Sequence, residues 1–579
     1  MKKNYYHTHS CGELRLKNVD ENVVISGWLA SIRKLGGIVF CTVRDNYGIT
    51  QIVVHDESLL NGICKETVVR VEGKVVERSS KNPNMETGDI EIEVSKIDVL
   101  GKCNPVLPFE INDAPNTKEE LRFKYRYLDL RNPKTHDILK KRSEILNYVR
   151  NKMHDNQFVE VQTPILASSS PEGARDFIVP TFFNKGEFYA LPQAPQQFKQ
   201  LLMVSGYEKY FQIAPCFRNE AARADRTPGE FYQIDFEMSF ATQEDIFEVC
   251  EDLVCGIYEN FTNYKITKAP FVRIPYKEAI DKYCSDKPDL RNPIIIHDVT
   301  KVFENCEFNA FKNKTVKAMA VNCKDKPRKF YDELSTYIVS YEGKGVAWLK
   351  YLDGQFTGSI AKFLTEKEKQ DIIDLVKVKD GDSVFFIADD KNKAIKLSNF
   401  LRIKLGEDLG LIDENQVIFC WIVDFPFYEI NEETGKLDFS HNPFSMPQGG
   451  LKSLLTKNPL NIVAYQYDLV CNGYEMLSGG VRNHDQETMV KAFELVGYDK
   501  FVVESKFSAL FNAFAYGAPP HAGGAIGFDR MLMQILGYDL VREVIAFPLN
   551  KNGRDLLMNT PSAISEETLK ELGLKVIKD

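Results

Sequence analysis

Alternating apolar and polar residues fill the first part of the chain, from residue 20 to about residue 103. A period of two residues is typical of strands that bury one face. Several turns between the alternating runs carry Gly, Asn or Asp, which favour reversal of the chain. The pattern predicts five short strands: Asn22–Trp28, Ile38–Arg44, Ile49–Val54, Val68–Lys74 and Asp89–Val94. So many short strands in so few residues favour a small closed β-barrel.

A different period begins after a connecting segment that has prolines at positions 105, 108 and 115. From Asp137 to Met153 the apolar residues recur at spacings of three and four, which predicts a helix with one buried face. Strands and helices then follow without regular βαβ alternation, which indicates an α+β fold with an antiparallel core sheet. Residues 290 to 412 break this pattern and hold no catalytic grouping, and the core pattern resumes at Val417–Asp424.

The segment from Phe217 to Phe240 combines a strand pattern with charged chemistry. It opens with Phe217-Arg218-Asn219-Glu220, continues through a loop rich in arginine and acids, and closes on the alternating run Phe231–Glu237. Two extended segments joined by such a loop predict an antiparallel hairpin. An arginine can fork onto a phosphate or carboxylate, and a glutamate can accept from an amine or help to hold a metal. The pattern favours a phosphate-handling site, and an ordinary strand end with a solvated ion pair is the alternative.

A glycine-rich segment near the C-terminus, His521–Arg530, precedes the apolar run Met531–Gly537. The run predicts a helix with Arg530 in its first turn. Because a cation there is unfavourable for the helix dipole, we expect Arg530 to have a partner outside the helix. The glycines match neither the GxxxxGK[ST] phosphate loop nor the dinucleotide-binding fingerprint.

Composition and charge narrow the class of protein. A chain of 579 residues predicts three or four domains, and 44% apolar with 27% charged residues is typical of soluble globular proteins. The net charge of −9 argues against an indiscriminate nucleic-acid binder, although a local basic face would suffice for RNA. Twelve cysteines without a CxxC pair favour reduced thiols in the cytoplasm over a zinc ribbon or a disulfide framework. We expect no signal peptide and no membrane span.

Three segments resemble the signature motifs of class II aminoacyl-tRNA synthetases: Phe158–Leu166, Phe217–Phe240 and His521–Arg530. Four more are similar to bacterial-type aspartyl-tRNA synthetases: Ser170–Asp176, Tyr189–Gln200, Arg223–Arg226 and Ser285–Pro293. The resemblance runs over essentially the whole chain. It implies an α+β fold with an N-terminal OB-fold β-barrel, a class II antiparallel-sheet catalytic core and an inserted α+β domain of the GAD type.

The same resemblance implies a division into domains. The expected parts are an anticodon-binding OB-fold (1–104), a linker (105–130), a first part of the catalytic core (131–288), the inserted domain (289–412), a second part of the core (413–560) and a C-terminal extension (561–579). The implied reaction has two steps. L-Aspartate and ATP give aspartyl-adenylate and pyrophosphate, and the aspartyl group then moves to the 3′ end of tRNA(Asp). Such transfers depend mainly on positioning and charge neutralisation.

Residues for ATP and its metal follow from the family motifs. The resemblance makes Arg218, Glu220 and Arg530 catalytic, with Arg218 bridging the amino-acid carboxylate and the α-phosphate. The implied ATP-binding residues are Arg218, Asn219, Glu220, Thr227, Phe231, Glu475, Gly527, Phe528, Asp529 and Arg530. Phe231 and Arg530 match the pair that sandwiches adenine, and without that match Phe231 would be taken as a core aromatic. The implied cofactor is Mg²⁺, held by Asp468 and Glu475.

Asp468 and Glu475 stand seven residues apart, and a solvated acidic pair is the usual interpretation of such a spacing. On one extended strand an odd offset points side chains to opposite faces, so a turn at Asn472-Gly473 would have to bring the two carboxylates together. For aspartate, the resemblance implies that Arg482 grips the side-chain carboxylate. The implied aspartate-binding residues are Glu172, Gln196, Lys199, Arg218, Asp235, His441 and Arg482.

The predicted barrel carries side chains suited to RNA. An aromatic residue can stack on a base while basic groups hold phosphates, and the implied anticodon-binding residues are Arg33, Leu35, Phe40, Gln51 and Lys81. A barrel without a nucleic-acid role is the alternative. Relaxed family members that also charge tRNA(Asn) tend to have histidine at the position of Leu35 and glycine near Lys81, so this chain favours tRNA(Asp) alone. An enzyme that charges both tRNAs remains the alternative.

Three residues depart from the usual family pattern. Asn219 stands where an aspartate is frequent, Ala194 where a serine is common, and Thr227 where many members have a glutamine near ATP. We expect these changes to affect affinity and not activity.

The resemblance also implies a homodimer with the region around Pro164 at its interface. Two other hypotheses are an asparaginyl-type synthetase, disfavoured by Arg482 with Lys199 and by the insertion, and a non-catalytic RNA-binding paralogue.

Overall fold

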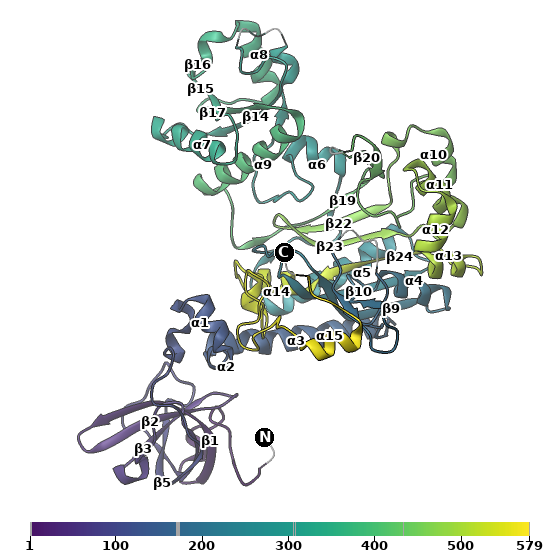
Figure 1. Ribbon diagram of the computed structural model, residues 1–579. Coiled ribbons are helices and arrows are strands. Elements are labelled where there is room, and N and C mark those ends of the chain that lie inside the picture. Colours follow the sequence, from purple (N-terminus) through teal and green to yellow (C-terminus); the bar gives the residue numbers. More distant parts are fainter. Residues whose placement is uncertain (1–2, 170–173, 305, 307, 432–433, 578–579) are drawn as a thin grey trace. The chain divides into compact units, whose positions relative to one another are not determined.

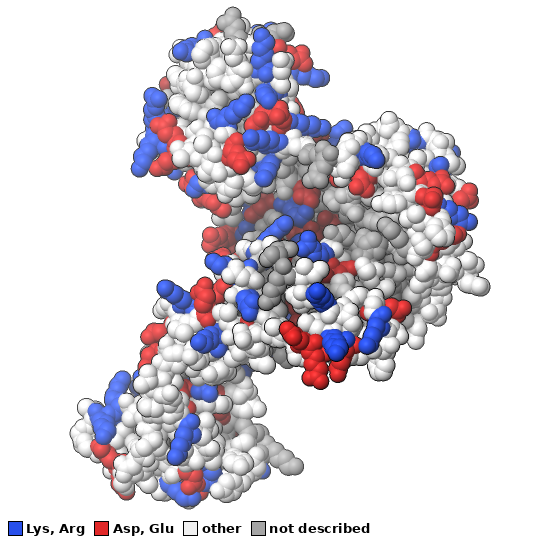
Figure 2. Space-filling view, viewed as in Figure 1, with Lys and Arg blue, Asp and Glu red and all other residues white. Residues whose placement is uncertain are grey.

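The computed structural model describes residues 3–169, 174–304, 306, 308–431 and 434–577. The chain divides into two compact units, Met1–Thr117 and Lys118–Asp579, whose elements are labelled in Figure 1. Each unit has its own hydrophobic core. Within the described helices, none has both the length and the apolar character needed to cross a membrane. On the face drawn in Figure 2, basic and acidic side chains are interspersed, so neither sign of charge dominates that face.

The first unit is a closed barrel of five strands in the order β1-β2-β3-β5-β4. The strands are β1 (Asn22–Leu35), β2 (Ile38–Arg44), β3 (Ile49–Val54), β4 (Val68–Glu77) and β5 (Ile90–Gly101). All five predicted strands are confirmed, and three of them extend beyond the predicted bounds. Alternate residues of β2, namely Val39, Cys41 and Val43, are buried in the barrel core. The alternation in the sequence is therefore the inside–outside pattern of the barrel.

Two short helices lie in the segment where we expected a connection between domains: α1 (Glu119–Lys124) and α2 (Arg126–Asp129). Both belong to the second unit, and each presents a buried arginine to the C-terminal region of that unit. Arg122 Nη2 donates to Glu543 Oε2 at 2.8 Å, and Arg126 Nη2 donates to the carbonyl oxygen of Ile545 at 2.7 Å. These bonds fix the start of the second unit against its C-terminal region.

The second unit contains an eight-stranded sheet in the order β12-β19-β22-β23-β24-β10-β9-β6. Its strands are β6 (Val159–Glu160), β9 (Lys209–Arg218), β10 (Gly229–Ser239), β12 (Val272–Pro275), β19 (Phe419–Val423), β22 (Gln466–Cys471), β23 (Tyr474–Val481) and β24 (His521–Gly527). Neighbouring strands are antiparallel except at the two edges, where β6 is parallel to β9 and β12 is parallel to β19. The predicted hairpin is confirmed as β9–β10, with Arg218 paired to Gly229.

Three helices pack their apolar residues into the main core on this sheet: α3 (Pro133–Asp155), α5 (Gln243–Phe261) and α14 (Phe528–Ile535). The predicted helix Asp137–Met153 is confirmed within α3. Its start is set locally, because Pro133 occupies the first turn and the side chain of Asn132 accepts from the backbone N–H of Lys134. Ile234 and Phe236 of β10 belong to the same core, so the side chains between them point to the other face of the sheet.

Between β12 and β19 the chain forms a second sheet, in the order β13-β14-β17-β15-β16. Its strands are β13 (His297–Asp298), β14 (Thr315–Asn322), β15 (Ala347–Leu352), β16 (Gln355–Gly358) and β17 (Asp382–Asp389). Its helices are α7 (Arg328–Ser340), α8 (Glu366–Val376) and α9 (Lys391–Asp408). The break in the sequence pattern is thus an α+β body with cores of its own.

The remaining elements are short and connect or flank the main sheet. The strands form three two-stranded pairs: β7 (Ile178–Pro180) with β8 (Phe188–Ala190), β11 (Lys265–Ile266) with β18 (Gln416–Val417), and β20 (Tyr428–Ile430) with β21 (Leu437–Phe439). The helices are α4 (Gln196–Val204), α6 (Tyr276–Tyr283), α10 (Gly450–Thr456), α11 (Gln486–Leu495), α12 (Lys500–Lys506), α13 (Ser508–Phe514) and α15 (Glu566–Leu572). The 3₁₀ turns are Leu16–Asn18, Glu57–Leu60, Ile111–Asn116, Thr300–Phe303, Ala361–Phe363, Pro459–Asn461 and Val541–Val544.

Candidate active site

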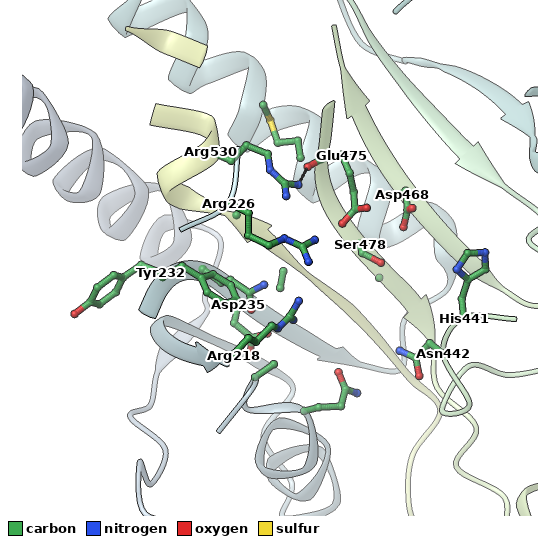
Figure 3. Close-up of a pocket in the computed structure, with 18 of the residues that line it drawn as sticks. Arg218, Arg226, Tyr232, Asp235, His441, Asn442, Asp468, Glu475, Ser478 and Arg530 are labelled. Carbon is green, nitrogen blue, oxygen red and sulfur yellow. Dashed lines mark hydrogen bonds between the residues drawn. The ribbon is translucent and has the colours of Figure 1, made fainter. Parts of the chain in front are cut away.

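A pocket of about 430 Å³ is lined by residues from α4, β10, β22, β23 and β24 (Figure 3). It collects most of the residues that the sequence suggested, although they are spread over more than half of the chain. The suggested residues that line it are Gln196, Lys199, Arg218, Thr227, Phe231, Asp235, His441, Asp468, Glu475, Arg482, Gly527, Asp529 and Arg530. Ala194, one of the departures from the family pattern, also lines it.

A fully buried group of four charges lies at one side of the pocket. Lys199 Nζ is 2.7 Å from Asp235 Oδ1 and 3.4 Å from Glu237 Oε2. Arg482 forks onto Glu237, with Nε donating to Oε1 at 2.8 Å and Nη2 donating to Oε2 at 3.0 Å. Among the described residues, none accepts a hydrogen bond from Arg482 Nη1. Nε and Nη2 of the guanidinium are thus bound to Glu237, and Nη1 is left to bind a ligand in the pocket.

Burial and pairing set the charges of this group. Burial alone would raise the pKa of Glu237, but Arg482 and Lys199 outweigh it and lower the pKa below its ordinary value. For Asp235 burial is the stronger effect, and its pKa is raised despite the contact with Lys199. A further positive charge beside Asp235 would oppose that shift. The group therefore favours a ligand that carries an ammonium as well as a carboxylate.

Glu237 was missed by the sequence analysis, although the alternation of β10 carried the signal. Gln233, Asp235 and Glu237 are alternate residues, and they face away from the core formed by Ile234 and Phe236. A run of three polar side chains on one face of a buried strand indicates a site when their partners are also charged.

Arg218 lies at the end of β9 with its guanidinium carbon 5.1 Å from the centre of the Phe231 ring. Its Nε is buried and has no hydrogen-bonding partner among the described residues. In Figure 3 the guanidinium groups of Arg218 and Arg226 point across the pocket toward Glu475 and Asp468. An unpaired buried donor next to an aromatic ring is suited to an anionic ligand that also has a flat ring.

Arg530 is in the first turn of α14, as predicted, and its partners lie outside that helix. Nη1 donates to the carbonyl oxygen of Glu475, and Nη2 is 3.1 Å from Asp225 Oδ2. The neighbouring Asp529 faces inward, where one oxygen accepts from the backbone N–H of Tyr232 at 2.7 Å and the other pairs with Arg142. The carboxylate of Asp529 therefore fixes α14 against β10.

Asp468 and Glu475 are brought together by a hairpin, as the spacing required. The turn residues Asn472 and Gly473 have φ of 48° and 87°, which favours the tight two-residue turn between β22 and β23. Val470 pairs with Glu475, so Asp468, two residues before Val470, shares a face with Glu475.

A register shift follows in the same hairpin. Leu469 pairs with Leu477, and Asp468 with Ser478, so Met476 is an extra residue on β23. The bulge places Ser478 on the same face as the two carboxylates (Figure 3). Asp468 Oδ1 is buried and has no hydrogen-bonding partner among the described residues. Burial, followed by the nearby Glu475, raises the pKa of Asp468 well above its ordinary value.

This acidic pair fits a hard cation that brings other ligands with it. A cation between the carboxylates would favour their charged forms and so offset both causes of the raised pKa. In the part of the chain that the structure describes, no group of three or more His, Cys, Asp or Glu side chains could hold a metal ion. Two carboxylates together with ligand phosphates and water match the habit of Mg²⁺, whereas a site made wholly of protein ligands is not available there.

Two more pocket residues were not assigned a role from the sequence, Asp286 and Lys287. They belong to a segment that was quoted only for its family resemblance. Lys287 Nζ lies 2.5 Å from Asp286 Oδ2 and 3.3 Å from Glu475 Oε2. His441 lies near them, and burial lowers the pKa of its imidazole below the ordinary value, so His441 is neutral at neutral pH.

Some suggested residues lie elsewhere. Asn219, Glu220 and Phe528 do not line the pocket: Glu220 pairs with Arg226 at 2.9 Å, and Phe528 is fully buried in the main core. The motifs could not reveal where Glu220 and Phe528 lie, because both positions depend on how the neighbouring chain packs. Glu172 lies outside the described residues, so its expected role is untested by the geometry.

On the barrel, Arg33 pairs with Phe40 across β1 and β2, and Gln51 pairs with Thr42 across β2 and β3. Because Phe40 and Thr42 are alternate residues, Arg33, Phe40 and Gln51 share the outer face. Leu35 is 67% exposed at the end of β1. Lys81 lies in the loop before β5 and pairs with Glu77 at 2.9 Å. Gln51 donates to Glu91 at 2.7 Å.

Comparisons with known proteins agree with this layout. Residues 118–551 match the family of tRNA synthetases of class II (D, K and N), and residues 23–100 match the OB-fold nucleic acid binding domain. The aspartate–tRNA ligase of Streptomyces coelicolor is 50% identical over 581 residues, which cover 99% of each chain. The aspartate–tRNA(Asp/Asn) ligase of Rickettsia prowazekii is 49% identical over 98% of this chain and 97% of its own.

Solved structures support the fold. A protein of Leishmania major Friedlin, described as a putative aspartyl-tRNA synthetase, matches over 94% of each chain with a TM-score of 0.60 and 20% identity. The asparaginyl-tRNA synthetase of Pyrococcus horikoshii with asparaginyl-adenylate covers 93% of this chain and 97% of its own, with a TM-score of 0.58 and 20% identity. At such identities the likeness concerns the fold alone.

Proposed function

The chain belongs to the class II tRNA synthetases (D, K and N), and from its site we infer that it is an aspartate–tRNA ligase. It activates L-aspartate with ATP to aspartyl-adenylate, releases pyrophosphate, and transfers the aspartyl group to the 3′ end of tRNA(Asp). The observation that carries this inference is the buried group of Lys199, Asp235, Glu237 and Arg482 beside Arg218. It offers cations to carboxylates, and it offers the unpaired Oδ2 of Asp235 to an ammonium, within one pocket.

Selection of aspartate rests on Arg482. Glu237 holds Nε and Nη2 of the guanidinium, so the remaining nitrogen is aimed by a rigid, charge-assisted pair. A substrate carboxylate accepts a charge-assisted hydrogen bond from that remaining nitrogen. The isosteric amide of asparagine brings no negative charge to that nitrogen, which disfavours the asparaginyl-type alternative. Asp235, with its raised pKa, takes the substrate ammonium, and Lys199 holds Asp235 in place.

On the nucleotide side, Arg218 neutralises the α-phosphate and the substrate α-carboxylate, and its unpaired Nε supports this role. Adenine lies between Phe231 and Arg530, with Thr227 and Gly527 beside it. Asn219 and Glu220, which follow Arg218 in the chain, and Phe528, which is buried in the main core, act without lining the pocket, and Asp529 acts through its hold on α14. Positioning attacking and leaving groups in line supplies most of the catalysis in such transfers.

Asp468 and Glu475 would hold Mg²⁺ on the ATP phosphates. When bound, the ion neutralises developing charge on the phosphate oxygens. Gln196 and His441 line the aspartate side; the neutral imidazole donates or accepts without adding charge. Glu172 completes the proposed contacts to the substrate ammonium.

ATP–pyrophosphate exchange with each amino acid in turn tests the proposal. Exchange is expected with aspartate and not with asparagine or lysine. Exchange that responds to asparagine instead would refute the assignment, and the absence of any exchange despite tRNA binding would favour the non-catalytic alternative.

For tRNA choice we propose strict charging of tRNA(Asp), with Arg33, Phe40 and Gln51 on the anticodon and Leu35 and Lys81 setting discrimination. A relative named aspartate–tRNA ligase is 50% identical to the chain and one named aspartate–tRNA(Asp/Asn) ligase is 49% identical, so the second candidate is an enzyme that charges both tRNAs. Purified tRNA(Asn) charged at a rate near that of tRNA(Asp) would establish the second candidate.

We further propose a homodimer in the cytoplasm, as the family resemblance implies. Val159, Ile165 and Leu166, around Pro164, are 46–53% exposed, which supports an apolar contact there. Sedimentation equilibrium is expected to give twice the mass of the chain. The monomer mass at micromolar concentration would contradict the dimer.

A further inference from the structure

The segment from Ser285 to Ile294 brings a lysine to the acidic pair of the pocket. We propose that Lys287 is a further substrate-contacting residue: its ammonium neutralises Glu475 in the free enzyme and moves to an ATP phosphate oxygen when the nucleotide and its metal ion bind. The proposal rests on the proposed function, since it takes ATP to be the ligand of this pocket. It gives a role to a segment that no motif reasoning assigned.

The side chain of Lys287 contacts two carboxylates, those of Asp286 and Glu475. Its Nζ lies 3.3 Å from Glu475 Oε2 and 2.5 Å from Asp286 Oδ2, and the side chain keeps 32% exposure toward the pocket. Two carboxylates this close to Nζ favour the charged form of the ammonium. The ion pair with Glu475 joins two segments about 190 residues apart in the chain.

The segment that carries Lys287 is fixed from the inserted body. Arg402 of α9 is 1% exposed and donates to three backbone carbonyl oxygens of the segment, those of Asp289, Asn292 and Ile294, at 2.7–3.0 Å. In return, Asn292 Nδ2 donates to the carbonyl oxygen of Arg402 at 2.8 Å. A guanidinium used wholly on backbone oxygens sets the path of the chain and does not serve as a surface charge.

The same segment touches the hairpin that carries the acidic pair. A Cβ added to Gly473 in the turn would lie 3.4 Å from the Cβ of Asp289. Asp289 is held by a fork from Arg291, whose Nη2 donates at 2.8 Å. Lys287 and Glu475 are therefore presented by two backbones in contact, which limits how far either side chain can shift without the other.

The chemistry of the pair gives Lys287 two successive partners. Before ATP binds, two carboxylates close together repel each other, and Lys287 offsets that repulsion. A metal ion that arrives with ATP supplies more positive charge than one ammonium, so Lys287 is displaced from Glu475. The four-carbon side chain then lets Nζ reach a polyphosphate oxygen, a typical partner of lysine.

Lys287→Met tests both parts of the proposal, the pairing with Glu475 in the free enzyme and the contact with ATP. The first predicts tighter binding of a metal ion and the second predicts weaker binding of ATP. Mn²⁺ titrated into the nucleotide-free enzyme and followed by electron paramagnetic resonance is expected to bind roughly 10-fold more tightly to the variant, since the competing cation is gone. In ATP–pyrophosphate exchange, the KM for ATP is expected to rise roughly 10- to 100-fold, while the KM for aspartate changes little. Lys287→Arg keeps the charge and is expected to stay near the wild-type values.

Lys282→Met is the matched control. Lys282 lies five residues earlier in α6, pairs with Glu278 at 2.7 Å on the surface, and does not line the pocket. Unchanged Mn²⁺ affinity in Lys287→Met, an unchanged KM for ATP, or equal shifts in Lys282→Met would each overturn the proposal. Failure of the proposed function is separate: the wild-type enzyme would then exchange with an amino acid other than aspartate, while the comparison of the variants would remain valid.

Discussion

Glu237 and Arg482 depend on each other, because both side chains are fully buried and each has the other as its main countercharge. Lys199 and Asp235 repeat this arrangement next to them. Buried ion pairs of this kind add little net stability compared with apolar packing, but removing one partner leaves an uncompensated charge. The site is therefore a group of buried ion pairs, to which the substrate adds its own charged groups.

Glu237→Gln is therefore expected to lower the free energy of unfolding by about 3–5 kcal/mol, because Arg482 loses its buried countercharge. Denaturation in urea followed by circular dichroism measures the change. Glu230→Gln, at an exposed position of the same strand, is the control and is expected to stay within about 0.5 kcal/mol of wild type. A loss below about 1 kcal/mol in Glu237→Gln would show that the pair is not needed for stability.

The same residue predicts a dependence on pH. The pKa of Glu237 is lowered in the folded chain, so its contribution to stability is present above the ordinary glutamate value of 4.5 and is lost as the pH falls through the lowered folded value. The difference in unfolding free energy between wild type and Glu237→Gln is expected to be constant near neutral pH and to shrink in acid. A difference that grows on acidification would contradict the sign of the shift.

At the scale of elements, the β22–β23 hairpin explains how residues seven apart reach one face. The turn at Asn472-Gly473 reverses the chain. The bulge at Met476 brings the Ser478 side chain to the face that carries the two carboxylates. The Asn-Gly turn could be expected from the sequence, because these residues tolerate positive φ. The bulge could not, since it arises where two strands are paired and leaves no local signature.

Gly473→Ala is expected to destabilise the chain by about 1–2 kcal/mol, because alanine is strained at a φ of 87°. The new Cβ also meets Asp289, so the variant is expected to raise the KM for ATP as well. Gly497→Ala is the control: its φ is 90° and nothing lies within 4 Å of the added Cβ. Thermal melting and exchange kinetics of both variants separate strain from the effect on the site. Equal values of KM in the two variants would refute a link between the turn and ATP binding.

For the whole molecule, the two units have separate cores. The barrel core contains only residues from the first unit, and the main core begins at Ile138. No apolar cluster within the described residues is shared between the units. Each unit therefore has the interior that independent folding requires.

A chain that starts at Lys118 is expected to keep aspartate-dependent ATP–pyrophosphate exchange and to lose tRNA charging by roughly 100-fold or more in kcat/KM, since stacking on the barrel is worth about 1–3 kcal/mol for each base. Both assays on the same preparation, with circular dichroism as the check on folding, measure this. Full charging by the shortened chain would contradict a role of the barrel in tRNA binding.

Much of this architecture was determined by the sequence alone. Alternation predicted the five barrel strands, the three- and four-residue period predicted α3, and the run Phe231–Glu237 predicted the second strand of the β9–β10 hairpin. These patterns are local, because one face of each element must be apolar to be buried. The family motifs likewise selected Arg218, Arg482 and Arg530, which all line one pocket.

Only the tertiary structure decided which groups face one another. Glu237 as the partner of Arg482, Asp289 beside Gly473, and Arg402 beneath the segment of Lys287 join parts of the chain that are 110 to 250 residues apart. A long-range contact depends on strand order, register and bulges, and a local pattern carries none of these. The sequence therefore identified the chemistry of the pocket, and the fold determined how its charges are balanced.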